Sequence, residues 1–287
     1  MPVSFREGYR AICWFYVEMQ DSDWRRKFAI TVFSHLGEVD PYFGVCFGKF
    51  SRVVDFYHRS AKVASHFLGT LSKKLSERNI HVSQSLVLCK PFIEPEPEKT
   101  KDSKIRAYTF FKPRSKDLIL SGMEAVSRLG QENRETFNVP YRATYWNNSC
   151  FPLMVITYGD SYADVVDSIR QNRMQADWAM DSSTFVSLRV SSETLDPVRD
   201  ERVKAIPAIV FAKPYSFPNI DHVNFRKWNV KTLGWPGCKE RFGWFDICDS
   251  LEFTSLYDLQ RYIINFKKDP RHKIRRTSTL LLKARKQ

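Results

Sequence analysis

The sequence predicts an α+β protein made of three tandem βαββαβ units. Two polar stretches divide the 287 residues into pieces of similar length, and the same order of strand and helix patterns recurs in each piece. In addition, 43% of the residues are hydrophobic, which is enough to build a sizeable core. We therefore expect three domains, comprising residues 1–93, 104–190 and 205–287.

The two polar stretches are predicted to be linkers. Glu94–Lys104 alternates proline with charge and contains no hydrophobic residue, so it has nothing to bury. Ser191–Lys204 is polar with a single proline and marks a weaker boundary.

The first unit contains β-branched and aromatic runs that favour strands and two amphipathic stretches that favour helices. Val63, Phe67, Leu71 and Leu75 are spaced four apart and are predicted to form the buried face of the second helix. The predicted elements are strand Tyr9–Glu18, helix Ser22–Leu36, strands Tyr42–Phe47 and Val53–Tyr57, helix Lys62–Glu77 and strand Val82–Cys89.

The other two units repeat this order. In the middle unit the predicted elements are strand Ile105–Phe111, helix Ser115–Leu129, strands Tyr141–Trp146 and Leu153–Tyr158, helix Tyr162–Met174 and strand Thr184–Val190. In the third unit they are strand Ala208–Ala212, a helix from Asp221 to Leu233, a hairpin over Arg241–Phe253, helix Leu256–Phe266 and strand Ile274–Leu282.

A unit of this kind is ferredoxin-like: it forms a four-stranded antiparallel sheet with both helices on one face. The other face needs cover, which a sheet from a neighbouring unit or subunit can provide. The continuous apolar runs Leu86–Cys89 and Leu280–Leu282 indicate strands buried on both faces. Because three such faces cannot pair off within one chain, we expect a homodimer or a larger assembly.

Three segments of the third unit, Phe242–Ile247, Ser255–Leu259 and Ile274–Leu282, resemble the effector-binding (RAM) module of Lrp/AsnC-type transcriptional regulators. The resemblance implies a dimeric α+β barrel fold, here in tandem copies without the helix-turn-helix domain of that family. It also implies that a small effector such as an amino acid binds near Gly243 and Asp246. The alternative is that Gly243 only forms a turn and Asp246 caps it.

Basic residues are concentrated in the third unit. Lys204–Gln287 contains 17 Lys and Arg against 7 Asp and Glu, which accounts for most of the net charge of +13. Such a cluster is typical of phosphate binding to DNA or RNA, although a solvated helix end with a basic tail explains it equally well. The candidate nucleic-acid-binding residues are Lys267, Lys268, Arg271, Lys273, Arg275, Arg276, Lys283, Arg285 and Lys286.

The sequence contains no recognisable catalytic or metal-binding motif. It has no G-x-S-x-G elbow, no P-loop and no G-x-G-x-x-G, and its six histidines lack metal-ligand spacing. We therefore expect no catalytic residues, no cofactor and no metal. The six cysteines never occur as C-x-x-C and are expected to be reduced core residues. No apolar stretch is long enough to span a membrane and the first residues do not resemble a signal peptide, so a cytoplasmic protein without membrane contact is expected.

These observations favour a non-enzymatic regulatory protein, similar to Lrp/AsnC proteins, that binds a small effector, nucleic acid or both in transcriptional regulation. Two alternatives remain open at this point. One is a nucleic-acid-binding or RNA-processing protein with tandem ferredoxin-like domains, and the other is a structural assembly subunit.

Overall fold

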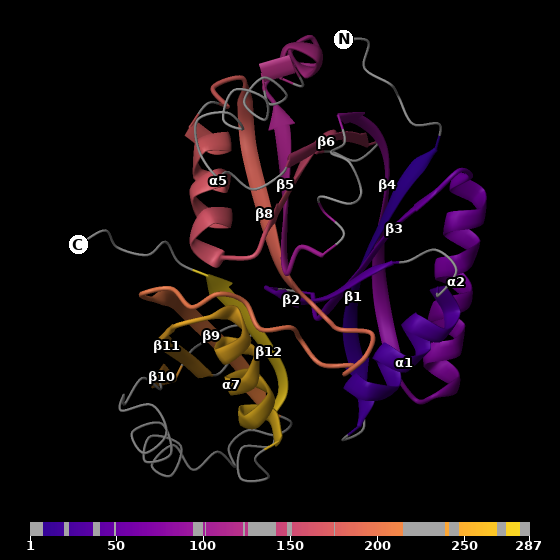
Figure 1. Ribbon diagram of the computed structural model, residues 1–287, viewed down its shortest axis with the longest axis vertical. Coiled ribbons are helices and arrows are strands. Elements are labelled where there is room, and N and C mark those ends of the chain that lie inside the picture. The colour runs from indigo at the N-terminus through magenta and orange to yellow at the C-terminus, as the bar shows by residue number, and fades with distance from the viewer. Residues whose placement is uncertain are drawn as a thin grey trace. The chain divides into compact units, whose positions relative to one another are not determined.

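Eight antiparallel strands close into a barrel in the order β1-β3-β2-β8-β5-β7-β6-β4 (Figure 1). The strands are β1 (Tyr9–Met19), β2 (Tyr42–Phe47), β3 (Arg52–His58), β4 (His81–Ile93), β5 (Ile105–Pro113), β6 (Arg142–Asn147), β7 (Leu153–Gly159) and β8 (Ala179–Arg189). A separate four-stranded sheet follows towards the C-terminus.

The structure is a computed structural model that describes residues 8–19, 23–36, 41–48, 50–93, 100, 102–122, 124–125, 142–147, 151–174, 176–214, 239–240, 247–268 and 274–281. The chain divides into two units. The first comprises residues 1–46 and 50–200 and contains the barrel, and the second comprises residues 47–49 and 201–287.

The barrel consists of two four-stranded sheets of the same design. One has the order β4-β1-β3-β2 and the other the order β8-β5-β7-β6, and they join where β2 neighbours β8 and β4 neighbours β6. At one join Cys89 lies opposite Asn147, and at the other the amide of Val190 donates to the carbonyl oxygen of Phe43 at 2.8 Å. The cover that the first sheet needs is therefore supplied by the second sheet of the same chain.

Helices α1 (Trp24–Leu36) and α2 (Ala61–Glu77) pack on the outside of the barrel beside the first sheet, and α5 (Tyr162–Met174) packs beside the second (Figure 1). Helix α1 buries a residue at every fourth position, from Trp24 and Phe28 onwards.

The predicted buried face of α2 is wrong in its first half. The helix buries Ala64, Leu68, Leu71 and Leu75, while Val63 is 38% exposed. The buried set of α2 combines spacings of four and three residues, which is the pattern that a helical repeat of 3.6 residues gives for one face.

The second unit contains a sheet with the order β10-β11-β9-β12 and a helix. Its elements are β9 (Ile206–Pro214), β10 (Lys239–Glu240), β11 (Ile247–Phe253), α7 (Leu256–Lys268) and β12 (Ile274–Leu281). The expectation that the run Leu280–Leu282 is buried on both faces is wrong at Leu280, which is 50% exposed. Strand β12 is an edge strand of this sheet, so its side chains have a neighbouring strand on one side only.

The α+β class and a large antiparallel sheet are confirmed, but three complete βαββαβ units are not. The predicted helix Ser115–Leu129 is observed in part, since residues 118–122 and 124–125 are helical and residues 123 and 126–129 lie outside the described residues. All of the predicted helix Asp221–Leu233 lies outside the described residues. Across the described part of the chain, no helix combines the length and the hydrophobicity that a membrane crossing requires.

The N-terminus of α7 is capped by Ser255, whose hydroxyl accepts the amide of Asp258 at 3.0 Å and donates to its carboxylate at 2.7 Å. We expect Ser255→Ala to weaken α7 by about 1 kcal/mol, because an N-cap acceptor is lost. Amide hydrogen exchange of residues 256–268 should accelerate several-fold, with α2 as the internal reference. Thr254→Ala is the matched control, since Thr254 donates to the same carboxylate but is exposed. An equal effect of both substitutions would contradict the assigned cap.

Candidate functional site

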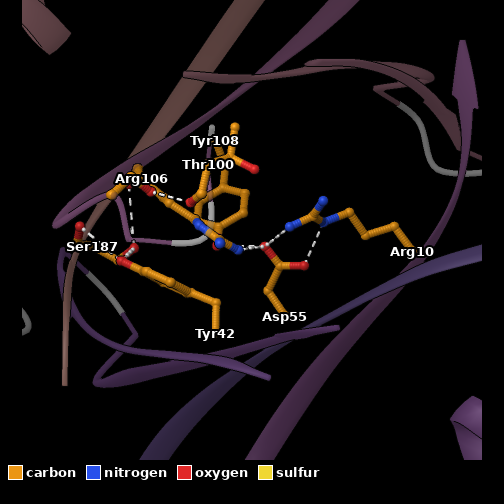
Figure 2. Close-up of polar contacts among 8 residues, drawn as sticks. Arg10, Tyr42, Asp55, Thr100, Arg106, Tyr108 and Ser187 are labelled. Carbon is orange, nitrogen blue, oxygen red and sulfur yellow. Dashed lines mark hydrogen bonds and ion pairs between the residues drawn. The ribbon is translucent and has the colours of Figure 1, made fainter. Parts of the chain in front are cut away.

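A buried ionic cluster lies inside the barrel, where two arginines approach one carboxylate from opposite sides (Figure 2). Asp55 accepts from Nε of Arg10 at 2.6 Å and from its Nη2 at 3.0 Å, and from Nη1 of Arg106 at 2.8 Å. The side chain of Asp55 has no exposed surface, whereas those of Arg10 and Arg106 keep 14% and 7%. Two guanidinium charges thus face one carboxylate charge in a nearly dry setting.

Tyrosines surround the cluster. The hydroxyl of Tyr108 donates to Asp55 at 3.0 Å, and the hydroxyl of Tyr42 is hydrogen-bonded to that of Ser187 at 2.9 Å (Figure 2). The guanidinium carbon of Arg106 lies 3.9 Å from the ring centre of Tyr42 and 5.1 Å from that of Tyr158. These cation–π contacts place the charge of Arg106 close to two aromatic rings.

The cluster also connects the two sheets of the barrel. Arg10, Tyr42 and Asp55 belong to the first sheet, whereas Arg106 and Tyr108 belong to the second. Because strand residues alternate between the two faces of a sheet, Asp55 on β3 points into the barrel together with Val53.

The surroundings fix the protonation states of the cluster. Burial alone would raise the pKa of Asp55, but the charges of Arg10 and Arg106 outweigh burial and hold that pKa below its usual value. Burial, and then the charge of Asp55, raises the pKa of Tyr108. Asp55 is therefore ionised and saturated with donors, and Tyr108 is a neutral donor.

Some donors remain unsatisfied in this interior. Among the described residues, Nε of Arg106 and Nε1 of Trp14 are buried and have no hydrogen-bond partner. Trp14 is only 3% exposed and packs in the same cluster as Tyr42, Tyr108 and Tyr158. A buried donor without a partner costs free energy that an added acceptor would recover.

The ionised state of Asp55 predicts an acid-dependent stability. An aspartate has a pKa of about 3.9 in the unfolded chain. Since the folded pKa is lower, Asp55 stabilises the fold above about pH 4, and this contribution disappears as the pH falls through the folded pKa. The difference in unfolding free energy between the wild type and Asp55→Asn should therefore shrink below about pH 4 in urea denaturation. A difference that stays constant down to about pH 2 would contradict the lowered pKa.

The site residues predicted from the sequence are only partly described. Gly243 and Asp246 lie outside the described residues, as do Arg271, Lys273, Lys283, Arg285 and Lys286. Lys267 and Lys268 form the end of α7, where they are half-buried and exposed. Arg275 and Arg276 belong to β12.

The sequence interpretation missed the barrel cluster altogether. A signal was present, because Asp55 interrupts the apolar run of β3 and Arg106 interrupts that of β5. A charge inside an otherwise apolar strand indicates a buried pair or a binding group.

No family model matches the sequence, and no curated protein matches it significantly. A heme-binding protein from Thermus thermophilus is similar in structure, with a TM-score of 0.50 and 10% identity over 68% of this chain and 96% of that one. A mutant chlorite dismutase from Candidatus Nitrospira defluvii in complex with cyanide has a TM-score of 0.49 and 10% identity over 66% and 93%. A provisional monooxygenase from Lactobacillus acidophilus NCFM has a TM-score of 0.46 and 8% identity over 64% and 94%.

At these identities the likeness shows the fold alone. The three structures named above are described as a heme-binding protein, a chlorite dismutase and a monooxygenase, and not as Lrp/AsnC modules. Three expectations from the sequence are therefore wrong. They are the membership of the Lrp/AsnC group, the description as a non-enzyme, and the regulatory function together with its two alternatives, a nucleic-acid-binding protein and a structural assembly subunit. The reason is that hairpin glycines and spaced threonines serve the βαββαβ plan itself, which hosts many functions.

Proposed function

We propose that the barrel binds a small organic anion at Arg106. The observation that carries this proposal is the buried Arg106, whose Nε–H has no partner among the described residues. Asp55 carries one negative charge and contacts the guanidinium groups of both Arg10 and Arg106. A buried donor without an acceptor is costly, and a bound anion would remove that cost.

The chemistry of the guanidinium defines the ligand group. A guanidinium is planar and presents paired N–H donors that match the two oxygens of a carboxylate or phosphate. Arg106 already uses Nη1 for Asp55, and its guanidinium carbon lies close to the rings of Tyr42 and Tyr158. An incoming oxygen would therefore meet the edge that carries Nε. Arg10 has the most exposed side chain of the three ionic residues and would attract the anion with a second positive charge.

Heme is a less suitable ligand for the described part of this chain. Heme iron needs an axial side chain such as histidine, thiolate or phenolate. His66 and His81 are exposed on the surface, His35 is hydrogen-bonded at both ring nitrogens, and Nδ1 of His58 accepts the amide of Ser60.

Cys46 and Tyr108 are also unsuitable as iron ligands. Burial raises the pKa of Cys46, and burial together with Asp55 raises that of Tyr108, which disfavours the anionic forms that bind iron. Cys46 and Tyr108 are therefore poor axial ligands, and the donors of Arg106 favour an organic anion instead.

Thermal denaturation with acetate, benzoate and inorganic phosphate at constant ionic strength tests this function. A ligand at about 100 times its dissociation constant should stabilise the folded state by about 2.7 kcal/mol. Arg106→Lys keeps the positive charge but lacks the planar pair of N–H donors, so this variant should bind the anion at least tenfold more weakly. Arg173→Gln, at an exposed arginine of α5, is the control and should bind like the wild type. If no anion stabilises the wild type, the proposed function is wrong.

We also propose the domain bounds 1–93, 104–190 and 205–287 and a third βαββαβ unit. The sheet of the second structural unit supports this. Its order β12-β9-β11-β10 is the same arrangement as β4-β1-β3-β2 and β8-β5-β7-β6 in the barrel. Assembly as a homodimer or larger in the cytoplasm is part of the same proposal. Light scattering of the purified protein tests the assembly, and a monomeric mass would contradict it.

For the C-terminal segment we propose a phosphate-contacting surface made by the nine basic residues Lys267, Lys268, Arg271, Lys273, Arg275, Arg276, Lys283, Arg285 and Lys286. Their charge supports this proposal. Gly243 and Asp246 stay a proposed ligand or interface hairpin. Binding of inorganic polyphosphate should weaken steeply as salt is added, and binding that is insensitive to salt would contradict the electrostatic surface.

A further inference from the structure

The interior of the barrel is divided into a charged part and an aromatic part. Tyr108 belongs to both, since its hydroxyl donates to Asp55 while its ring meets Trp14 edge to face, with 5.5 Å between the ring centres. Beyond Tyr108, Trp14 is ringed by Phe110 at 5.6 Å and Phe185 at 5.9 Å. The aromatic part of the interior therefore consists of flat apolar rings.

Trp14 adds one specific polar feature to the aromatic part. Its indole N–H is a donor only, it is buried, and it has no partner among the described residues. The tryptophan therefore offers a hydrogen bond to an oxygen or nitrogen acceptor that reaches this end of the interior. This observation is independent of the charge on Arg106, because Trp14 is on β1 and Arg106 is on β5.

We propose that the ligand is an aromatic carboxylic acid that carries a hydrogen-bond acceptor on the side of the ring remote from its carboxylate. The carboxylate binds Arg106, the ring packs against Tyr108 and Phe110, and the remote acceptor takes the indole N–H of Trp14. This inference rests on the proposed function, since it assigns the ligand class of the same anion site.

A matched indole exists elsewhere in the chain. Trp178 is also buried with an unpartnered Nε1 among the described residues, but it packs with Phe111 and Leu153. These two residues alternate along their strands with the interior residues Phe110 and Met154, so Trp178 lies on the opposite face of the second sheet. A substitution of Trp178 therefore controls for the general effect of replacing a buried indole.

Calorimetric titration with benzoate and with 4-acetylbenzoate tests the inference. The two acids differ in the remote acceptor, and one hydrogen bond to it should make 4-acetylbenzoate bind about fivefold to tenfold more tightly to the wild type. In Trp14→Phe, which keeps an aromatic ring but has no N–H, the ratio of the two affinities should fall to about one. In Trp178→Phe the ratio should stay that of the wild type.

The outcomes separate this inference from the proposed function. If benzoate and acetate bind with equal affinity, or if Trp14→Phe keeps the ratio, the aromatic ligand class is wrong although the anion site remains. If no anion binds, both fail. If Trp14→Phe does not fold, the NMR resonance of the Trp14 indole N–H in the wild type tests the same hydrogen bond. It should shift on addition of 4-acetylbenzoate but much less with benzoate, and equal shifts would overturn the inference.

Discussion

Replacement of Asp55 by alanine is expected to destabilise the barrel by about 3–5 kcal/mol. The substitution removes the acceptor for Arg10, Arg106 and Tyr108 and leaves two guanidinium groups close together without their shared carboxylate. The cost is large because a buried charge that loses its partner keeps its full desolvation penalty. Urea denaturation at neutral pH, followed by tryptophan fluorescence, measures the loss.

Asp102→Ala is the control for this prediction. The carboxylate of Asp102 lies 3.8 Å from Arg189, but its side chain is 90% exposed, so its loss should change stability by less than about 1 kcal/mol. If the two substitutions reduced the free energy of unfolding equally, the buried cluster would contribute no more to stability than an exposed ion pair. An additional result is expected from ligand binding: if the anion compensates Arg106, it should stabilise Asp55→Ala more than the wild type.

Replacement of Phe28 by alanine is expected to cost about 3–5 kcal/mol. Phe28 on α1 is fully buried and stacks on Phe43 of β2, with 5.6 Å between the ring centres and 8° between the planes. It also meets Phe15 of β1 edge to face at 5.5 Å. Its truncation therefore leaves a cavity where the helix meets β1 and β2 of the first sheet, and these strands cannot collapse to fill it.

The control for Phe28 is Ile30→Ala on the same helix. Ile30 is 36% exposed, so this truncation opens no closed cavity and should change stability by about 0.5 kcal/mol or less. Both variants are compared by urea denaturation under the same conditions. If Phe28→Ala costs no more than Ile30→Ala, the stacked rings do not form a tight core between α1 and the sheet.

Elements whose signals are local were predicted well from the sequence. The strand expected over Tyr9–Glu18 is observed as Tyr9–Met19, and the helix expected over Leu256–Phe266 is observed as Leu256–Lys268. Apolar periodicity and capping residues decide such elements within one or two turns of chain.

Functional residues were harder to recognise because their meaning depends on distant partners. Asp55 lies 45 residues from Arg10 and 51 from Arg106, and only the closure of the barrel brings the three together. The motif around Gly243 and Asp246 looked more informative because it is continuous in sequence, yet the family that it indicated was wrong. Short motifs of turns and caps report on backbone geometry, which unrelated functions share.

The sequence by itself determined the α+β class, the antiparallel strand order and the position of most strands and helices of the barrel, because these depend on the alternation and spacing of neighbouring residues. Only the tertiary structure decided that the first two sheets cover each other, and that Arg10, Asp55, Arg106 and Trp14 share one interior. Pairing between sheets depends on edges and faces that are far apart in the chain. The cost of a buried charge depends on everything packed around it, which no local pattern records.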